Sequence, residues 1–184
     1  MLGSGAYLVV LAPTLALAGD WRWPAAHLNA SLLIGGLLWH SLGLWRTHPE
    51  LLLRRGKRYR EIPSWDRYLV LWIRLSILGI WGIAGWQFRQ QGIPAWGLTS
   101  ALGPLSIGLG ICLVAWAQSN NPFFEAYVRH QPQEGHQVAD RGPYRRLRHP
   151  GYAGYLLMLL GQPLLLGGGW TWWPFTLAVL GFGA

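Results

Sequence analysis

Charged residues and cysteine are scarce in this sequence. Asp, Glu, Lys and Arg make up 12% of the 184 residues, whereas an ordinary soluble domain carries about 25%. The single cysteine, Cys112, lies inside an apolar run and has no partner for an intrachain disulfide. The sequence contains no phosphate-binding glycine loop, nucleophile elbow or cysteine cluster. These absences argue against a soluble domain, a disulfide scaffold and the common hydrolase and nucleotide-binding motifs.

Apolar residues and tryptophan are abundant instead. Hydrophobic residues account for 52% of the chain, and many of the 13 tryptophans stand at the ends of apolar runs. An indole ring is amphipathic, so tryptophan favours the interface between a membrane and water. The sequence therefore predicts an all-α protein, a polytopic transmembrane helical bundle that forms one integral-membrane domain over residues 1–184. Its N-terminal spans would occupy residues 1–117, and a functional loop with the C-terminal spans would occupy residues 118–184.

Five apolar runs approach the roughly 20 residues that a helix needs to cross a bilayer core. They are residues 2–18, 28–45, 68–88, 96–117 and 151–167, and a partial sixth begins near Trp170. From there to Ala184 a helix would rise only about 22 Å across a core of roughly 30 Å. We therefore expect a C-terminal truncation, with a tilted or re-entrant segment as the alternative. Residues 1–18 could also be a cleaved signal peptide, although the usual Lys or Arg is absent from residues 1–6.

Basic residues concentrate in two of the connections. Residues 46–67 and 118–150 hold twelve of the 15 Lys and Arg, and two spans separate them, so both face one side of the membrane. The connections on the opposite side carry only Arg22 and Arg89. Cytoplasmic connections are enriched in Lys and Arg, so we expect these two on the cytoplasmic side of a bacterial inner membrane. The net charge of +8 is then explained by topology and anionic lipid headgroups, without a nucleic-acid partner.

Residues 142–154, with the sequence GPYRRLRHPGYAG, gather polar and ring-bearing side chains beside an apolar run. Pro150 suits the first position of a helix, which places His149 beside the N-cap and Tyr152 in the first turn. A helix start presents N–H groups and the positive end of a dipole, which favour a carboxylate or phosphate. Arg148 and His149 would add hydrogen-bond donors. The segment therefore predicts a binding site for an anionic or zwitterionic ligand at the membrane edge.

Simpler interpretations remain open for single residues of this segment. Arg145 and Arg146 suit plain anchoring at lipid headgroups, and the tyrosines suit an interfacial aromatic belt. Gly151 and Gly154 suit close helix packing. A second packing face is predicted by small residues that recur every three positions: Ser76, Gly79, Gly82 and Gly85.

Other polar residues are weaker candidates for a site. Arg74 lies inside a predicted span and either snorkels to the surface or faces a substrate cavity. His40 has no second histidine at matching depth that would complete a haem site. His136 and His149 lack carboxylate or cysteine partners, so we predict no metal.

Four motifs together resemble the isoprenylcysteine carboxyl methyltransferase family, to which the phospholipid N-methyltransferases are related. They are Asn121-Pro122-Phe123-Phe124, Gly135-His136-Gln137-Val138, Gly142-Pro143-Tyr144 and the run from Arg148 to Gly154. The resemblance covers about residues 118–174. It implies an integral-membrane methyltransferase that uses S-adenosylmethionine from the cytoplasmic side. The cofactor contacts that it implies are His136, Gly142, Pro143, Tyr144, Arg148, His149, Pro150, Tyr152 and Gly154.

The resemblance also implies an amphiphilic or lipid-like methyl acceptor, with membrane lipids as partners. A carboxylate acceptor, such as a prenylcysteine, needs no base, and no Asp or Glu inside a span would deprotonate an amine. Alternatives are a phospholipid amine N-methyltransferase, an enzyme of the membrane sterol-reductase type and a non-catalytic lipid-binding fragment. The family pattern continues into a later segment with an Arg and two acidic residues, which this sequence does not reach. The catalytic residues stay unassigned.

Overall fold

The computed structural model describes residues 4–47, 49, 64–92, 97–121, 124 and 139–183. These parts of the chain are helical and contain no strand. Their elements, in chain order, are α1 (Ser4–Ala18), α2 (Pro24–Thr47), α4 (Ser64–Gln91), α5 (Leu98–Ser119), η2 (Gly142–Arg145), α6 (Pro150–Leu166), η3 (Gly169–Thr171) and α7 (Trp172–Gly183). The predicted all-α class is confirmed for the described residues.

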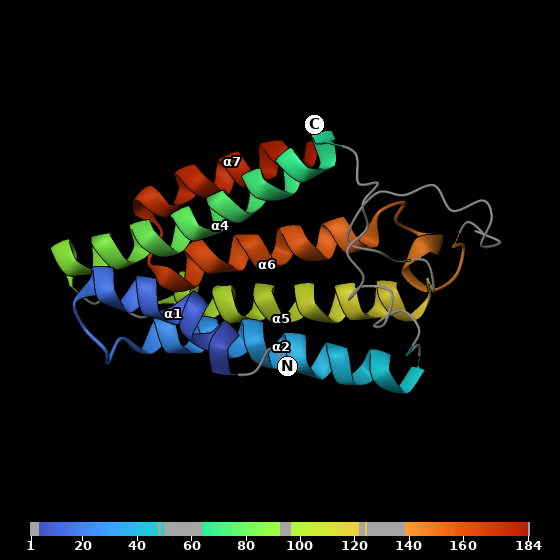
Figure 1. The fold of residues 1–184 in the computed structure, drawn as a ribbon, viewed down its shortest axis with the longest axis horizontal. Helices are drawn as coiled ribbons and strands as arrows, with labels where there is room; N and C mark the ends of the chain where they lie inside the picture. The colour runs from blue at the N-terminus through green and yellow to red at the C-terminus, as the bar shows by residue number, and fades with distance from the viewer. Residues whose placement is uncertain are drawn as a thin grey trace.

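The long helices lie side by side and run up and down an elongated bundle (Figure 1). α2 and α5 end, and α4 and α6 begin, toward the same end of the bundle, on the right of Figure 1. We call this the loop end. The two basic stretches, 46–67 and 118–150, therefore start and finish on one side, as the sequence predicts.

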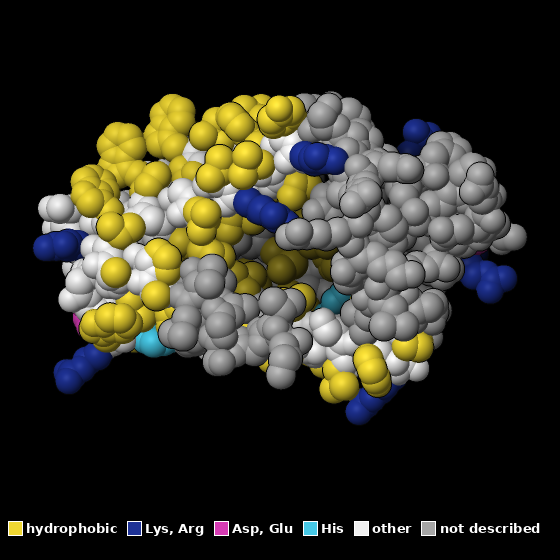
Figure 2. Space-filling view, in the orientation of Figure 1, with side chains coloured by type: hydrophobic (Ala, Val, Ile, Leu, Met, Phe, Trp, Pro, Cys, Tyr) yellow, Lys and Arg dark blue, Asp and Glu magenta, His cyan; other side chains and the backbone are white. Residues whose placement is uncertain are grey.

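Within the described residues, three helices are long and apolar enough to cross a membrane: Pro24–Arg46, Val70–Gln91 and Leu98–Ser119. The remaining helices are shorter, with 15 residues in α1, 17 in α6 and 12 in α7. The predicted count of five spans and a partial sixth is therefore not confirmed. Large apolar side chains are exposed along the helices, and they cover much of the visible surface over α4 and α7 (Figure 2). Such a surface is suited to lipid rather than water, which fits an integral membrane protein.

Consecutive glycines divide the C-terminal apolar stretch into two short helices. Gly167, Gly168 and Gly169 have φ angles of 106°, 66° and 60°, a region that side chains with a Cβ rarely adopt. Gly168 donates its N–H to the Pro163 carbonyl at 2.7 Å, which closes the end of α6. The chain reverses there, so α7 returns toward the loop end beside α4 (Figure 1).

The contact between α5 and α6 is built on glycines. Gly103 packs against Gly161, and Gly110 packs against Gly154, so the two contacts are seven positions apart on each helix. A Cβ on Gly110 would lie 2.5 Å from the Gly154 carbonyl oxygen. Ser106 donates a hydrogen bond of 2.7 Å across the same contact, to the Leu157 carbonyl. The helix backbones can approach this closely only because side chains are absent.

The predicted small-residue face of α4 packs against two helices. Gly79 lies against Pro174 of α7, and Gly85 lies against Thr14 of α1. Trp81 adds a buried hydrogen bond of 2.5 Å from its indole N–H to Gln162 of α6. The packing interpretation of this face is therefore confirmed.

Arg74 lies on a different side of α4, where its side chain is exposed. It lines neither of the two cavities described below. This placement favours snorkelling over a role in a substrate cavity.

Two substitutions test the α5–α6 contact. We expect Gly110→Ala to destabilise the protein by about 1–3 kcal/mol, because the added methyl group meets the α6 backbone. Gly108→Ala is the matched control, since no atom lies within 4 Å of its Cβ position. The control should be neutral or stabilising by up to about 1 kcal/mol through helix propensity. Thermal unfolding in detergent measures both, and equal melting temperatures would contradict the assigned contact.

Candidate functional site

The segment before α6 is docked on the end of α5. Gly142 has a φ of +58°, and a Cβ at this position would lie 2.5 Å from the Asn120 side chain. Asn120 is the C-cap of α5 and donates from its amide to the Trp116 carbonyl at 2.9 Å. Glycine is therefore required at position 142 both for its backbone angle and for this close approach. The contact fixes where η2 begins relative to α5.

Tyr144 is the half-buried residue of this turn. Its hydroxyl accepts a hydrogen bond of 3.2 Å from the Asn121 amide. Burial raises the pKa of Tyr144 above the ordinary tyrosine value, and the hydrogen bond from Asn121 offsets part of that rise. The buried Pro143 carbonyl accepts from the N–H groups of Arg146 and Leu147 at 3.1 and 3.0 Å, which closes the turn. The phenol is thus held neutral at the loop end.

The start of α6 agrees with the sequence prediction. Pro150 is the first residue of the helix and is buried, and His149 is the N-cap. The His149 side chain makes no capping hydrogen bond. Its ring stacks on Tyr152, with the ring centroids 5.5 Å apart and the planes inclined by 21°. The positive end of the α6 dipole therefore lies beside an exposed imidazole–phenol pair.

The remaining predicted residues divide into exposed and packed ones. Arg148 is exposed next to His149. Gly154 is buried against Gly110 and Val114 of α5, and a Cβ on Gly151 would meet the ring of Phe124. Both glycines thus serve packing, and a contact between Gly154 and a cofactor remains a prediction. His136 lies outside the described residues.

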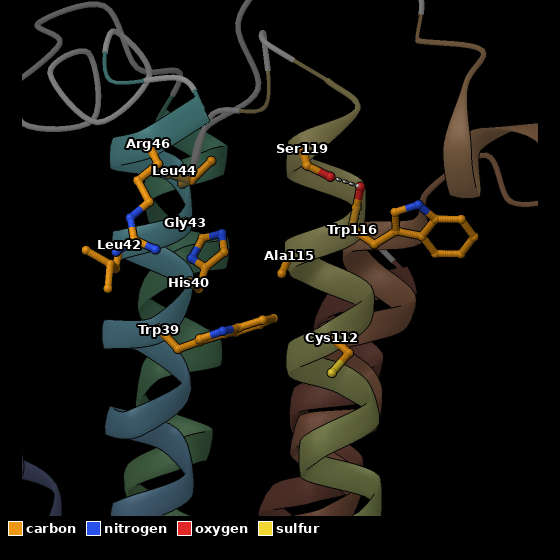
Figure 3. Close-up of a pocket in the computed structure, with 10 residues that line it drawn as sticks. All are labelled: Trp39, His40, Leu42, Gly43, Leu44, Arg46, Cys112, Ala115, Trp116 and Ser119. Atoms are coloured by element: carbon orange, nitrogen blue, oxygen red, sulfur yellow. Dashed lines mark hydrogen bonds between the residues drawn. The ribbon is translucent and has the colours of Figure 1, made fainter.

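A groove lies between α2 and α5 at the loop end, and no motif in the sequence predicts it. Its volume is about 380 Å³. In Figure 3 the Trp39 ring extends from α2 toward α5, and His40 points into the space between the two helices. The lining residues recur at helical spacing on both helices: Trp39, Gly43 and Arg46 on α2, and Cys112, Trp116 and Ser119 on α5. That spacing is visible in the sequence, but nothing in the sequence pairs the two faces.

A smaller cavity of about 120 Å³ adjoins this groove. His40 lines both, and α6 contributes Tyr155 and Met158 to the smaller one. Gln118 also lines it, with only 1% of its surface exposed, and no described residue is a hydrogen-bond partner of its Oε1. A buried amide oxygen without a partner is costly, so Gln118 marks a polar position at the junction of α2, α5 and α6.

Residues 98–182 match the model of the phospholipid methyltransferase family. The match runs from the start of α5 into α7 and so contains the α5–α6 contact, η2 and the start of α6. This is the family of membrane methyltransferases related to isoprenylcysteine carboxyl methyltransferase, so the resemblance is confirmed over this region. The match supports a membrane methyltransferase in general. In the comparisons with curated proteins and with solved structures, nothing matches.

The burial of Tyr144 gives a pH dependence. Its pKa is raised in the folded protein, so the unfolded chain releases this proton first as the pH rises through about 10. The contribution of Tyr144 to the free energy of unfolding is therefore constant below that pH and is lost above it. We expect Tyr144→Phe to lose less stability than the wild type between about pH 9 and about pH 11.

Chemical unfolding at the two pH values measures this difference. Asn121→Ala is the second variant, because removing the donor that lowers the pKa should steepen the loss of stability. The same pH dependence in the wild type and in Tyr144→Phe would contradict a buried phenol.

Proposed function

We propose that this protein is a membrane-bound methyltransferase that uses S-adenosylmethionine and acts on a carboxylate of a lipid-like or prenylcysteine-like acceptor. The proposal is supported by two findings that concern the same part of the chain. The family match covers residues 98–182, and within it the loop end holds a helix start flanked by His149, Tyr152 and Arg148. A membrane methyltransferase would use polar groups of this kind to hold its cofactor at the membrane edge.

The residues at the start of α6 fit the chemistry of this cofactor. S-adenosylmethionine carries a carboxylate, a sulfonium cation and an aromatic base. The dipole of α6, the uncapped helix start and Arg148 would hold the carboxylate. The rings of Tyr152 and Tyr144 would lie against the sulfonium or the base, where a cation over a ring face gains about 0.5–2 kcal/mol. Gly142, Pro143, Pro150 and Gly154 would shape this pocket through the backbone, and His136 would complete it.

A carboxylate acceptor suits the groups that line the two cavities. When bound, the cofactor supplies a methyl group, whose carbon–sulfur bond breaks as a carbon–oxygen bond forms on the acceptor. An ionised carboxylate loses no proton in this reaction, so the protein only has to hold the reacting groups in line. Among the described residues, no Asp or Glu lines either cavity.

Methylation of a phospholipid amine is the second candidate. The matched family is that of the phospholipid methyltransferases, and an amine must lose a proton when it is methylated. His40, in the lining of both cavities, is of the side-chain type that most often accepts such a proton. The reductase interpretation has no such observation in its favour.

We further infer that the loop end faces the cytoplasm of a bacterial inner membrane. Arg46, Arg67, Arg141 and Arg145 lie near the helix ends on this side, whereas Arg22 and Arg89 lie at the opposite end. This asymmetry follows the positive-inside rule. The cofactor would then enter from the cytoplasm, and the acceptor would enter from the lipid between helices.

Cofactor binding tests the assigned site. We expect His149→Ala to weaken S-adenosylmethionine binding at least about tenfold, since one charge-assisted hydrogen bond or ring contact is worth about 1.4 kcal/mol or more. Isothermal titration of the purified chain measures the affinity. Arg146→Ala is the matched control, an exposed residue of the same segment for which we favour lipid anchoring, and it should stay within about twofold. If His149→Ala binds as tightly as its control, the site is wrongly assigned.

Tracing the methyl group tests the reaction. We expect label from methyl-labelled S-adenosylmethionine to appear in a lipid extract as a base-labile ester. Base-stable label on an amine would instead establish the second candidate. Binding of NADPH in place of S-adenosylmethionine would favour the reductase, and binding of neither would leave a lipid-binding protein.

A further inference from the structure

We propose that the groove between α2 and α5 is the acceptor site, and that it takes a single-chain amphiphile with a carboxylate headgroup. The apolar chain would lie between Gly43 and Ala115, with the carboxylate at Arg46. This inference rests on the proposed function, because it specifies the acceptor class and the residues that select it.

The shape of the groove comes from the way α2 and α5 separate. Near the middle of the bundle the helices touch, and a Cβ on Gly36 would collide with the Ile111 side chain. Two turns further along α2, nothing lies within 4 Å of the Cβ position of Gly43. The helices therefore enclose open space toward the loop end, and its volume of about 380 Å³ falls within the usual range for small-molecule sites, roughly 300–1,000 Å³.

The lining of the groove is apolar except toward the loop end. Trp39 extends across the space from α2, and Ala115 faces it from α5 (Figure 3). Arg46 lies at the last turn of α2, and its side chain runs back along the helix beside Leu42 (Figure 3). Arg46 is the cation of the lining, and no acidic residue stands among the described residues that line the groove, so the charge favours an anion over an amine.

The groove is connected through one shared residue to the helix that carries the candidate cofactor site. His40 lines both the groove and the smaller cavity, and Gln118 and Tyr155 are among the other lining residues of the smaller cavity. Tyr155 lies three residues after Tyr152, and so about one turn further along α6. The Gln118 amide can turn either its NH₂ group or its oxygen toward a ligand, so it can donate a hydrogen bond to a carboxylate. The smaller cavity therefore lies between the acceptor groove and α6.

Photolabelling of the full chain in detergent micelles tests the shape of the site. The probe is a long-chain fatty acid with a diazirine in the chain, and the labelled peptides are mapped by mass spectrometry. We expect label on residues 39–46 and 112–119. Gly43→Leu should reduce this label at least about fivefold, because the added side chain occupies the space of the probe. Gly35→Leu is the matched control on the same helix, also with nothing within 4 Å of its Cβ position, and should leave the label unchanged.

A pair of probes tests the charge. The second probe is an alkylamine with the same chain and the same diazirine. We expect Arg46→Gln to lower fatty-acid labelling about threefold or more, the effect of losing one ion pair at a partly exposed site, and to leave amine labelling unchanged or higher. Arg89→Gln, at the opposite end of the bundle, should change neither. Equal labelling by the two probes in the wild type, or equal labelling of Gly43→Leu and Gly35→Leu, would overturn the proposal.

The two levels of the proposal can fail separately. Photolabelling requires no S-adenosylmethionine, so its result stands whether or not the chain transfers a methyl group. Ala115→Leu fills the same space from α5 and replaces Gly43→Leu if that variant does not fold. Label that maps to the outer face of α4 instead of the groove would identify ordinary boundary lipid and would also overturn the proposal.

Discussion

The close contact between α5 and α6 determines the position of everything at the loop end. Gly103 with Gly161 and Gly110 with Gly154 let the two backbones meet without side chains between them. Because the helices are antiparallel, the C-cap of α5 and the N-cap of α6 lie at the same end. Asn120 can then hold Gly142, and Pro150 can start α6 beside it. The polar segment thus acquires its geometry from an apolar contact in the middle of the bundle.

Local features of this region could be predicted from the sequence. Pro150 as the first helical residue, His149 at the cap and Tyr152 in the first turn all follow from preferences that act within a few residues. The turn at Asn120 is local in the same sense. The packing face of α4 was also predictable, because small residues at a helical period allow close packing against any neighbouring helix.

Features that depend on distant parts of the chain could not be predicted. The groove requires Gly43 to face Ala115, and nothing in the sequence specifies which helices are neighbours or where they separate. Gly154 illustrates the same limit. A glycine lets either a ligand or another helix approach its backbone, and the sequence does not say which; in the structure it is α5 that packs there. The number of membrane spans is similar. The break at Gly167, Gly168 and Gly169 lies where two predicted runs meet, but the length of the helix before it depends on tertiary packing, and α6 has 17 residues.

The contact between Gly36 and Ile111 brings α2 and α5 together beyond the groove, toward the middle of the bundle. Gly43 lies seven residues further along α2, which corresponds to a depth of about 10 Å. An extended chain longer than this cannot continue between the helices and must turn outward into the lipid. The protein would therefore sense the headgroup and only the first part of the chain, so acceptors that differ only in the length of the chain beyond this point would be equivalent to it. Ile111 would thus block the space between α2 and α5. The part of an amphiphile on the loop-end side of Ile111 would contact the protein, and the rest of its chain would lie in the membrane.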